Sequence, residues 1–237
     1  MAPSGLYLCN LPVNRCNQRL FDFSTISIFE MLNKYAFIAV DIQNEFASKG
    51  GRYYTPKKSV KFLKNILFPF LKSNRICIGE IVSDYRNPRP GNREECCLPG
   101  KWGYRSLIPV QLKKNPVWVK CMHSPVWIRK DFGSSKKRAG MPIPNSKKFT
   151  NWLEKIIGRH QNTVPVVIGL TIDCCVLATV QELSWRGYKP IILKEGVDSD
   201  SGKINDRNKI LKLVIKNWAK TVSWQELRPL LITRSGK

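Results

Sequence analysis

The sequence predicts an α/β fold in which a mostly parallel sheet lies between helices on both of its faces. Short apolar runs alternate with amphipathic segments of roughly 12 to 17 residues, which is typical of repeated strand–helix units. Several of these runs are apolar on both faces, as expected of buried parallel strands. The length of 237 residues suits one such domain.

The first half of the domain alternates strand and helix after an N-terminal segment with no clear period. Residues 1–33 are expected to be an extension with little structure of its own, and residues 34–237 the folded domain. The run 36–41 is apolar and ends in an acid, so it predicts a buried strand. Segment 56–73 is amphipathic and predicts a helix that Pro69 should kink or end.

The second half continues the same alternation. A Pro-, Gly- and Cys-rich stretch, 87–104, is expected to be a long loop, and such loops are often functional. Glycine at 187 should end the helix 173–185. The remaining elements are predicted from the same patterns: strands 76–82, 116–120, 125–130, 163–170, 188–193 and 221–223, and helices 145–160, 203–219 and 224–231.

Charge and composition narrow the functional classes. The net charge of +23 favours contact with polyanions. The basic residues are spread along the chain without a nucleic-acid signature, so only non-specific nucleic-acid binding is expected. No apolar run approaches 18 residues and residues 1–23 lack an export signal, which predicts a cytoplasmic protein away from the membrane. The eight cysteines should be mostly reduced thiols.

Sites in parallel sheets lie beyond the carboxyl ends of the strands. This rule selects Asp41, Asp84, Lys130 and the turn 170–175. Within that turn, Cys175 falls in the first turn of a predicted helix, where backbone N–H groups and the helix dipole favour thiolate and can bind an oxyanion. The alternative is that the Cys-Cys pair only packs the helix against the sheet.

Two further side chains give Cys175 a chemical context. Asp41 can act as general base to the thiol, although a turn aspartate is common after a strand. Lys130 could hold the thiolate and the carboxylate and stabilise charge, although it could also be a surface lysine. Lys120, at the end of the preceding predicted strand, competes with Lys130 for this role.

These motifs resemble those of the isochorismatase-like hydrolases, which include nicotinamidases and N-carbamoylsarcosine amidohydrolases. Residues 41–46, DIQNEF, are similar to the D-x-Q-x-x-F signature of that superfamily. Residues 173–176, DCCV, resemble its D-x-C-V turn and put Cys175 at the position of the nucleophile. Segment 126–130 resembles the strand that delivers a catalytic lysine, here Lys130. The likeness runs from about residue 36 to residue 231.

The resemblance implies a three-layer Rossmann-like fold with a central six-stranded, mostly parallel sheet, and a homo-oligomer. It implies a cis peptide between Leu170 and Thr171, and an oxyanion hole formed by the backbone N–H groups of Thr171 and Cys175. By analogy Phe46 lines the substrate pocket, with core packing as the alternative. Trp102 is a candidate for the pocket wall, with a surface or packing role as the alternative.

The implied reaction is cysteine-dependent hydrolysis of an amide or related C–N bond of a small molecule through a thioester. Two other classes stay open: a catalytically inactive binding or regulatory protein with the same fold, and a polyanion-binding protein.

One departure from the family concerns metal. Metal-dependent nicotinamidases carry an aspartate and several histidines after the second strand. Here Asp84 fits the aspartate, Arg86 stands where the first histidine would be, and the stretch 84–104 contains no histidine. His123 and His160 lie elsewhere and are expected to be structural or exposed. We therefore predict no bound metal and no other cofactor.

The same departure leads to a hypothesis about the substrate. Guanidinium groups bind carboxylates in bidentate fashion, so Arg86 could contact a carboxylate of the substrate. The alternative is a salt bridge from Arg86 to Asp84, or to Glu94 or Glu95.

Overall fold

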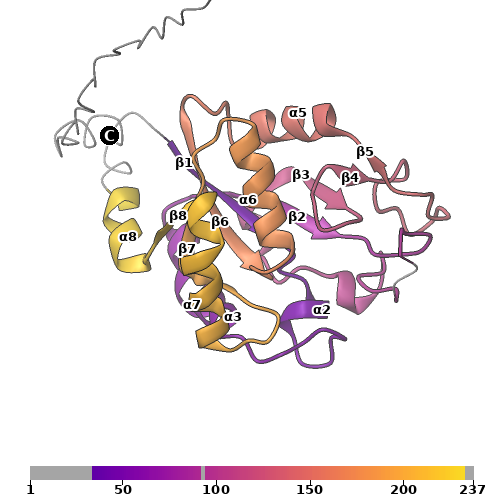
Figure 1. Ribbon diagram of the computed structural model, residues 1–237, viewed down its shortest axis with the longest axis horizontal. Helices are drawn as coiled ribbons and strands as arrows, with labels where there is room; N and C mark the ends of the chain where they lie inside the picture. Colours follow the sequence, from indigo (N-terminus) through magenta and orange to yellow (C-terminus); the bar gives the residue numbers. More distant parts are fainter. Residues whose placement is uncertain (1–33, 92–93, 233–237) are drawn as a thin grey trace, which may run out of the picture. The chain divides into compact units, whose positions relative to one another are not determined.

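The computed structural model describes residues 34–91 and 94–232, and the predicted N-terminal extension, 1–33, lies outside this part of the chain. Its centre is a six-stranded sheet with the order β3-β2-β1-β6-β7-β8 (Figure 1). Every neighbouring pair in this sheet is parallel. The strands are β1 (Lys34–Val40), β2 (Ile78–Ser83), β3 (Lys113–Lys120), β6 (Thr163–Leu170), β7 (Ile191–Asp198) and β8 (Lys220–Val222).

Helices follow most of the strands, as the alternating pattern predicted. They are α2 (Asn44–Ala47), α3 (Lys58–Phe62), α4 (Phe68–Ser73), α5 (Ser146–Ile156), α6 (Cys175–Trp185), α7 (Ile204–Leu213) and α8 (Trp224–Ile232). Short 3₁₀ turns occur at Trp102–Tyr104, Val110–Leu112 and Ile215–Asn217. Among the described residues, no helix combines the length and apolarity that a membrane crossing needs.

Two hydrophobic clusters cover the two faces of the sheet. In β1, Ile38 and Val40 belong to the cluster that contains the apolar faces of α5, α6 and α7, whereas Phe37 and Ala39 belong to the cluster with α4 and α8. This alternation follows from the period of two along a strand. Helices α6 and α7 lie in front of the sheet in Figure 1. The predicted three-layer α/β fold, with its six-stranded parallel sheet, is therefore confirmed.

The predicted helix 56–73 is one helical run that does not end at Pro69. A π-helical turn, Leu63–Leu67, joins α3 to α4, and Pro69 lies in the first turn of α4. Proline has no N–H to donate, so a change in the hydrogen-bond ladder just before it is expected.

The predicted strand 125–130 differs most from the structure. Only β4 (Trp127–Ile128) forms there, and it pairs antiparallel with β5 (Ile143–Pro144) outside the main sheet. This ribbon is not part of the parallel sheet, so Lys130 does not lie at the carboxyl end of one of the sheet's strands.

The strand order places the topological switch point at β1. From β1 the chain builds β2 and β3 on one side and β6, β7 and β8 on the other. The crevice at the carboxyl ends of such neighbouring strands is where ligands bind in open α/β sheets.

Candidate active site

Side chains from four strand ends converge at this crevice. Asp41 follows β1, Ser83 ends β2, Lys120 ends β3, and Cys175 begins α6 just after β6. Tyr85 comes two residues after β2. Parallel strands bring their carboxyl ends to one edge, so residues far apart in the sequence meet there.

Lys120 is the centre of this cluster, and its side chain is fully buried. Its Nζ lies 2.8 Å from Asp41 Oδ2 and donates hydrogen bonds to Ser83 Oγ at 2.7 Å and Cys175 Sγ at 3.2 Å. The same nitrogen donates to the Tyr85 hydroxyl at 2.8 Å, and Ser83 Oγ donates to Asp41 Oδ1 at 2.9 Å. One ammonium group therefore contacts a carboxylate, two hydroxyls and the thiol.

The prediction that Lys130 occupies this position is wrong, and its competitor Lys120 lies there. Lys130 is exposed. It follows β4, whose two residues pair only with β5, whereas Lys120 ends β3 and pairs in register with Ser83. Lys120 therefore reaches the crevice from a strand of the main sheet, and Lys130 does not.

Two residues hold together the strands around Asp41. Gln43 Oε1 accepts a hydrogen bond from Ser83 N at 2.8 Å, and Gln43 Nε2 donates to Ser83 O at 3.1 Å, so the glutamine of the D-x-Q motif ties the end of β1 to the end of β2. Gly169 has φ +133°, and a Cβ built there would lie 2.1 Å from Val40 O. Only glycine allows β6 to pass this closely beside Asp41.

The candidate nucleophile is a neutral thiol at rest. Burial raises the pKa of the Cys175 thiol to about 12; Lys120 and Tyr85 oppose this increase, and Asp41 adds to it. The sequence-based expectation that the helix start would favour thiolate is therefore wrong for the free protein. Desolvation of this buried thiol outweighs the favourable contacts around it.

The two groups nearest to the thiol are hydrogen-bond donors at neutral pH. Burial alone would lower the pKa of Lys120, but Asp41 and Cys175 raise it well above the usual value for lysine. Burial raises the pKa of Tyr85 well above its usual value, and its hydroxyl lies 3.3 Å from Cys175 Sγ. The ammonium and the phenol both face the sulfur, where they can stabilise negative charge.

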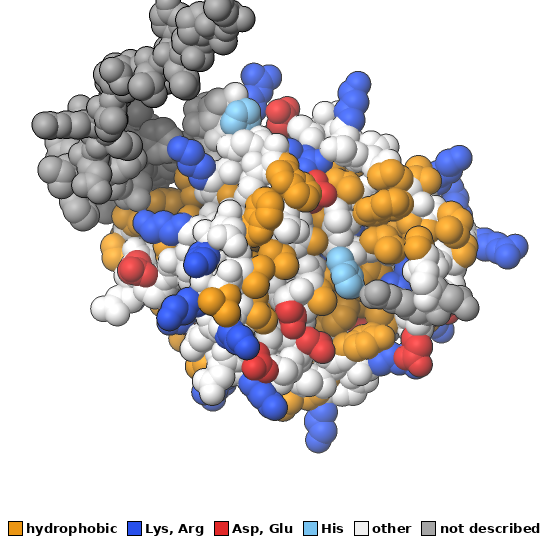
Figure 2. Space-filling view, in the orientation of Figure 1, with side chains coloured by type: hydrophobic (Ala, Val, Ile, Leu, Met, Phe, Trp, Pro, Cys, Tyr) orange, Lys and Arg blue, Asp and Glu red, His pale blue; other side chains and the backbone are white. Residues whose placement is uncertain are grey.

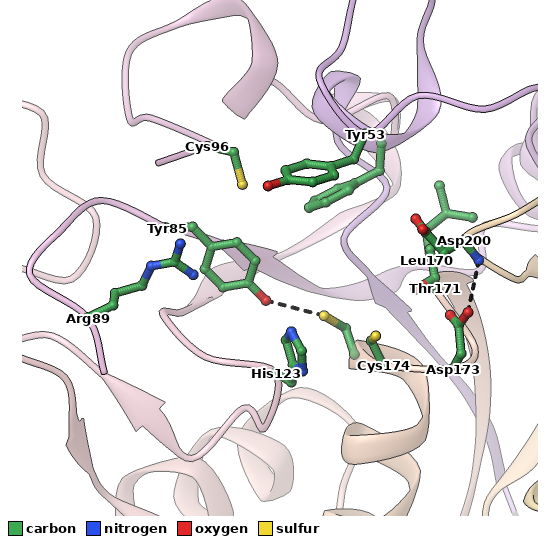
Figure 3. Close-up of a pocket in the computed structure, with 12 residues that line it drawn as sticks. Tyr53, Tyr85, Arg89, Cys96, His123, Leu170, Thr171, Asp173, Cys174 and Asp200 are labelled. Carbon is green, nitrogen blue, oxygen red and sulfur yellow. Dashed lines mark hydrogen bonds between the residues drawn. The ribbon is translucent and has the colours of Figure 1, made fainter. Parts of the chain in front are cut away.

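The thiol opens into a cavity of about 330 Å³, within the range of small-molecule sites. Figure 3 shows the side chains around it. Phe46, for which the family resemblance implied a place in the pocket, and Thr171 both line the cavity, and the Leu170–Thr171 peptide is cis. The other lining residues are Tyr53, Tyr85, Arg89, Cys96, His123, Leu170, Asp173, Cys174, Cys175 and Asp200.

No family model and no curated protein sequence matches the chain, but solved structures do. An isochorismatase-like hydrolase from Alkaliphilus metalliredigens is 17% identical, with a TM-score of 0.58 over 84% of this chain and 98% of that one. The nicotinamidase from Bacillus subtilis is 16% identical, with a TM-score of 0.56 over 80% of this chain and 99% of that one. The N-carbamoylsarcosine amidase from Thermoplasma acidophilum is 18% identical, with a TM-score of 0.52 over 80% and 96%.

The fold is that of the isochorismatase-like hydrolases. The likeness that the D-x-Q and D-x-C-V motifs indicated is thereby confirmed for the fold. At these identities the residues of the site must be judged by their own geometry.

Within this isochorismatase-like fold, Arg86 does not face the cavity. Its Nε and Nη2 donate to the two oxygens of Asp84 at 2.8 and 2.6 Å, and Nη2 also contacts Asp131 Oδ2 at 2.5 Å. Its Nη1 donates to two backbone carbonyls. The predicted contact with a substrate carboxylate is wrong, and the alternative, a salt bridge to Asp84, is what the structure contains.

Trp102 is also absent from the lining residues of the cavity. Its side chain is 45% exposed and lies over Gly50. The predicted role as a pocket wall is therefore replaced by its alternative, a surface position. The backbone carbonyl of Trp102 accepts a hydrogen bond from Asn44 Nδ2 at 3.0 Å.

The residues after β2 do not fit a metal ion. Both carboxylate oxygens of Asp84 accept hydrogen bonds from Arg86, and Arg129 Nε lies 4.0 Å from the same carboxylate. Two guanidinium groups oppose a cation at this position. In the described part of the chain, no three side chains of the metal-binding types gather into a possible metal site.

Sequence reasoning missed several residues of the site. Tyr85 comes three residues after the end of the predicted strand 76–82, so the strand-end rule could have found it. His123 was expected to be structural or exposed. It is exposed, and it also lines the cavity. Tyr53 and Arg89 come from loops whose paths have no clear signal in the sequence.

The basic residues do not gather around this cavity. Figure 2 shows Lys and Arg side chains distributed around the edges of the visible face, with acidic and hydrophobic side chains nearer its middle. That distribution favours neither the cavity nor one patch on this face as a polyanion site.

Proposed function

We propose that this chain is a cysteine-dependent hydrolase that cleaves an amide or related C–N bond of a small molecule. One observation carries the proposal: the Cys175 thiol at the start of α6 contacts the buried Lys120 ammonium, which is ion-paired with Asp41. A nucleophile, a base and a cation thus meet at the wall of a cavity. Solved structures with this fold include a nicotinamidase and an N-carbamoylsarcosine amidase.

Asp41 is the proposed general base. Its Oδ2 is buried and lies 2.8 Å from the Lys120 nitrogen, which also donates to Cys175 Sγ at 3.2 Å, so the carboxylate and the thiol share one neighbour. This oxygen can therefore take the thiol proton as sulfur attacks the substrate carbonyl. Because the resting thiol is neutral, proton transfer accompanies attack. Lys120 then stabilises whichever of the thiolate and the carboxylate is charged.

The intermediate carries its negative charge on the former carbonyl oxygen. The backbone N–H groups of Thr171 and Cys175 are the proposed donors to that oxygen. The N–H groups of Cys174 and Val176 both donate to Thr171 O, which closes the turn between β6 and α6. Collapse of the intermediate breaks the C–N bond, and the departing nitrogen takes the proton from Asp41.

The second half of the reaction removes the acyl group from sulfur. Asp41, again ionised, takes a proton from a water molecule as that water attacks the thioester. The C–S bond breaks, the acid leaves, and the proton returns to Cys175. Both half-reactions use the same base and the same oxyanion donors, and no other reactant is needed.

The proposal is tested by hydrolysis of a panel of small amides by the purified full chain. Release of ammonia or amine is followed for the wild type, Cys175→Ala and Cys174→Ala. Cys174 also lines the cavity but makes no hydrogen bond with Lys120 in the described structure, so it is a matched control. We expect turnover to be lost in Cys175→Ala and to remain in Cys174→Ala.

Two results would count against the proposal. Undiminished turnover in Cys175→Ala would exclude a thioester at this residue. Absence of hydrolysis across the panel, together with substrate binding by the wild type, would favour a catalytically inactive binding protein.

A further inference from the structure

The cavity is electrostatically asymmetric about the nucleophile. Figure 3 shows Arg89 and Asp173 on opposite sides of the hydrogen bond between Tyr85 and the sulfur of Cys175. Asp200 lies beside Asp173, and its N–H donates to Asp173 Oδ2 at 3.1 Å. One side of the cavity is therefore cationic and the other is anionic.

Arg89 is positioned for a ligand. Its guanidinium carbon lies 4.6 Å from the centre of the Tyr85 ring, so the ring orients it. Its Nη2 donates to Glu94 O at 2.8 Å, and its buried Nε has no hydrogen-bond partner in the part of the chain that the structure describes. Among the described residues, no aspartate or glutamate forms an ion pair with Arg89.

The hydrogen bonding of Arg89 differs from that of Arg86, whose guanidinium donates to two carboxylates and two carbonyls. A buried donor without an acceptor is costly, and a planar guanidinium is best matched by a carboxylate. On the other side of the sulfur, Asp173 and Asp200 disfavour a second anion. The two sides together orient an anionic substrate, with its negative group toward Arg89 and away from Asp173 and Asp200.

We infer that the substrate is an amide that also bears a carboxylate, and that Arg89 binds this carboxylate. This inference rests on the proposed function and specifies its substrate class. The scissile carbonyl lies over Cys175, and the neutral or cationic part of the substrate points toward Asp173. The ring of Tyr85 contacts the guanidinium with its face and the sulfur with its hydroxyl, so the carboxylate and the carbonyl are separated by only a few bonds.

The test uses short amic acids (malonamic, succinamic and glutaramic acid) against the corresponding diamides, in which the carboxylate is replaced by a neutral amide. Each is assayed with the wild type, Arg89→Gln and the control Arg105→Gln. Arg105 is exposed and does not line the cavity. We expect Arg89→Gln to lower kcat/KM for the preferred amic acid by about 10- to 100-fold, mainly through KM, and to lower kcat/KM for the diamide much less. Arg105→Gln should change neither.

Binding of the amic acids to Cys175→Ala, measured by calorimetry, separates this inference from the proposed function. Binding that disappears when Arg89→Gln is added supports carboxylate recognition even where no amide is hydrolysed. Equal turnover of amic acids and diamides, or an equal loss for both in Arg89→Gln, would overturn the inference and leave the hydrolase proposal intact. Absence of both Arg89-dependent binding and Arg89-dependent turnover would overturn it as well.

Discussion

Replacing Lys120 by methionine should have a large effect, whereas the same change at Lys130 should have almost none. Methionine keeps most of the length of the lysine stem but removes the ammonium. The Asp41 carboxylate would then be fully buried without its cation. Removing one partner of a buried ion pair costs about 3–5 kcal/mol.

This cost has a measurable size in thermal unfolding. A loss of 1 kcal/mol lowers Tm by roughly 2–4 °C in a chain of this length, so Lys120→Met should lower Tm by roughly 6–20 °C. Lys130 is exposed, and Lys130→Met should change stability by no more than about 0.5 kcal/mol. The double variant Lys120→Met with Asp41→Asn removes both charges and should recover part of the loss.

The assays are thermal and urea unfolding, followed by kcat/KM on any amide that the wild type hydrolyses. Lys120→Met should also lower kcat by about 10²–10³-fold, as removal of a group that stabilises transition-state charge does. Equal unfolding midpoints for Lys120→Met and the wild type would refute the buried ion pair. A larger loss of activity in Lys130→Met than in Lys120→Met would refute the assignment of the lysine.

Four further predictions concern the nucleophile and its surroundings. Because burial raises the pKa of Cys175 to about 12, iodoacetamide at pH 7.5 should alkylate it tens of times more slowly than the exposed Cys77; peptide mapping that finds Cys175 labelled first would contradict this. Its labelling rate should rise steadily from pH 8 to 10, since the thiolate fraction grows tenfold per pH unit below the pKa. Asp41→Asn should speed alkylation of Cys175, because Asp41 raises the pKa of the thiol, yet should abolish hydrolysis; parallel changes in both rates would exclude Asp41 as base. Gly169→Ala should lower Tm by several degrees, because its Cβ would lie 2.1 Å from Val40 O, and an unchanged Tm would show that the two strands are not this close.

The fold was predictable because its signals are local and repeated. Runs such as 163–170 are apolar on both faces and are bounded by turns, so each predicts a buried strand by itself. The D-x-Q and D-x-C-V motifs also identified Asp41, which follows β1, and Cys175, which begins the helix after β6. Both motifs lie next to strands of the central sheet.

The lysine was harder to predict because two strand-like runs end in lysine. Residues 116–120 and 125–130 have similar apolar content, and the choice between them depends on which run joins the main sheet. That choice is made by tertiary pairing: β3 pairs with β2, whereas β4 pairs only with β5. Propensity does not encode such long-range contacts.

Which arginine faces the cavity depends on loop geometry, and the protonation state of Cys175 depends on burial. Arg86 and Arg89 both follow β2, and nothing in their order shows that Asp84 and Asp131 occupy the first and leave the second facing the cavity. The helix-start argument for Cys175 was sound for an accessible thiol. It failed because Cys175 is buried beside Tyr85 and Lys120, and this burial can be seen only in the folded structure.

The most direct test of the central claim is intact-protein mass spectrometry after rapid acid quenching of the full chain with a hydrolysed amide. The account predicts an added mass equal to the acyl group, mapped to Cys175, removed by hydroxylamine and absent from Cys175→Ala. A wild-type protein that turns over substrate with no acyl adduct under rapid quenching, or an adduct that persists in Cys175→Ala, would contradict the thioester mechanism.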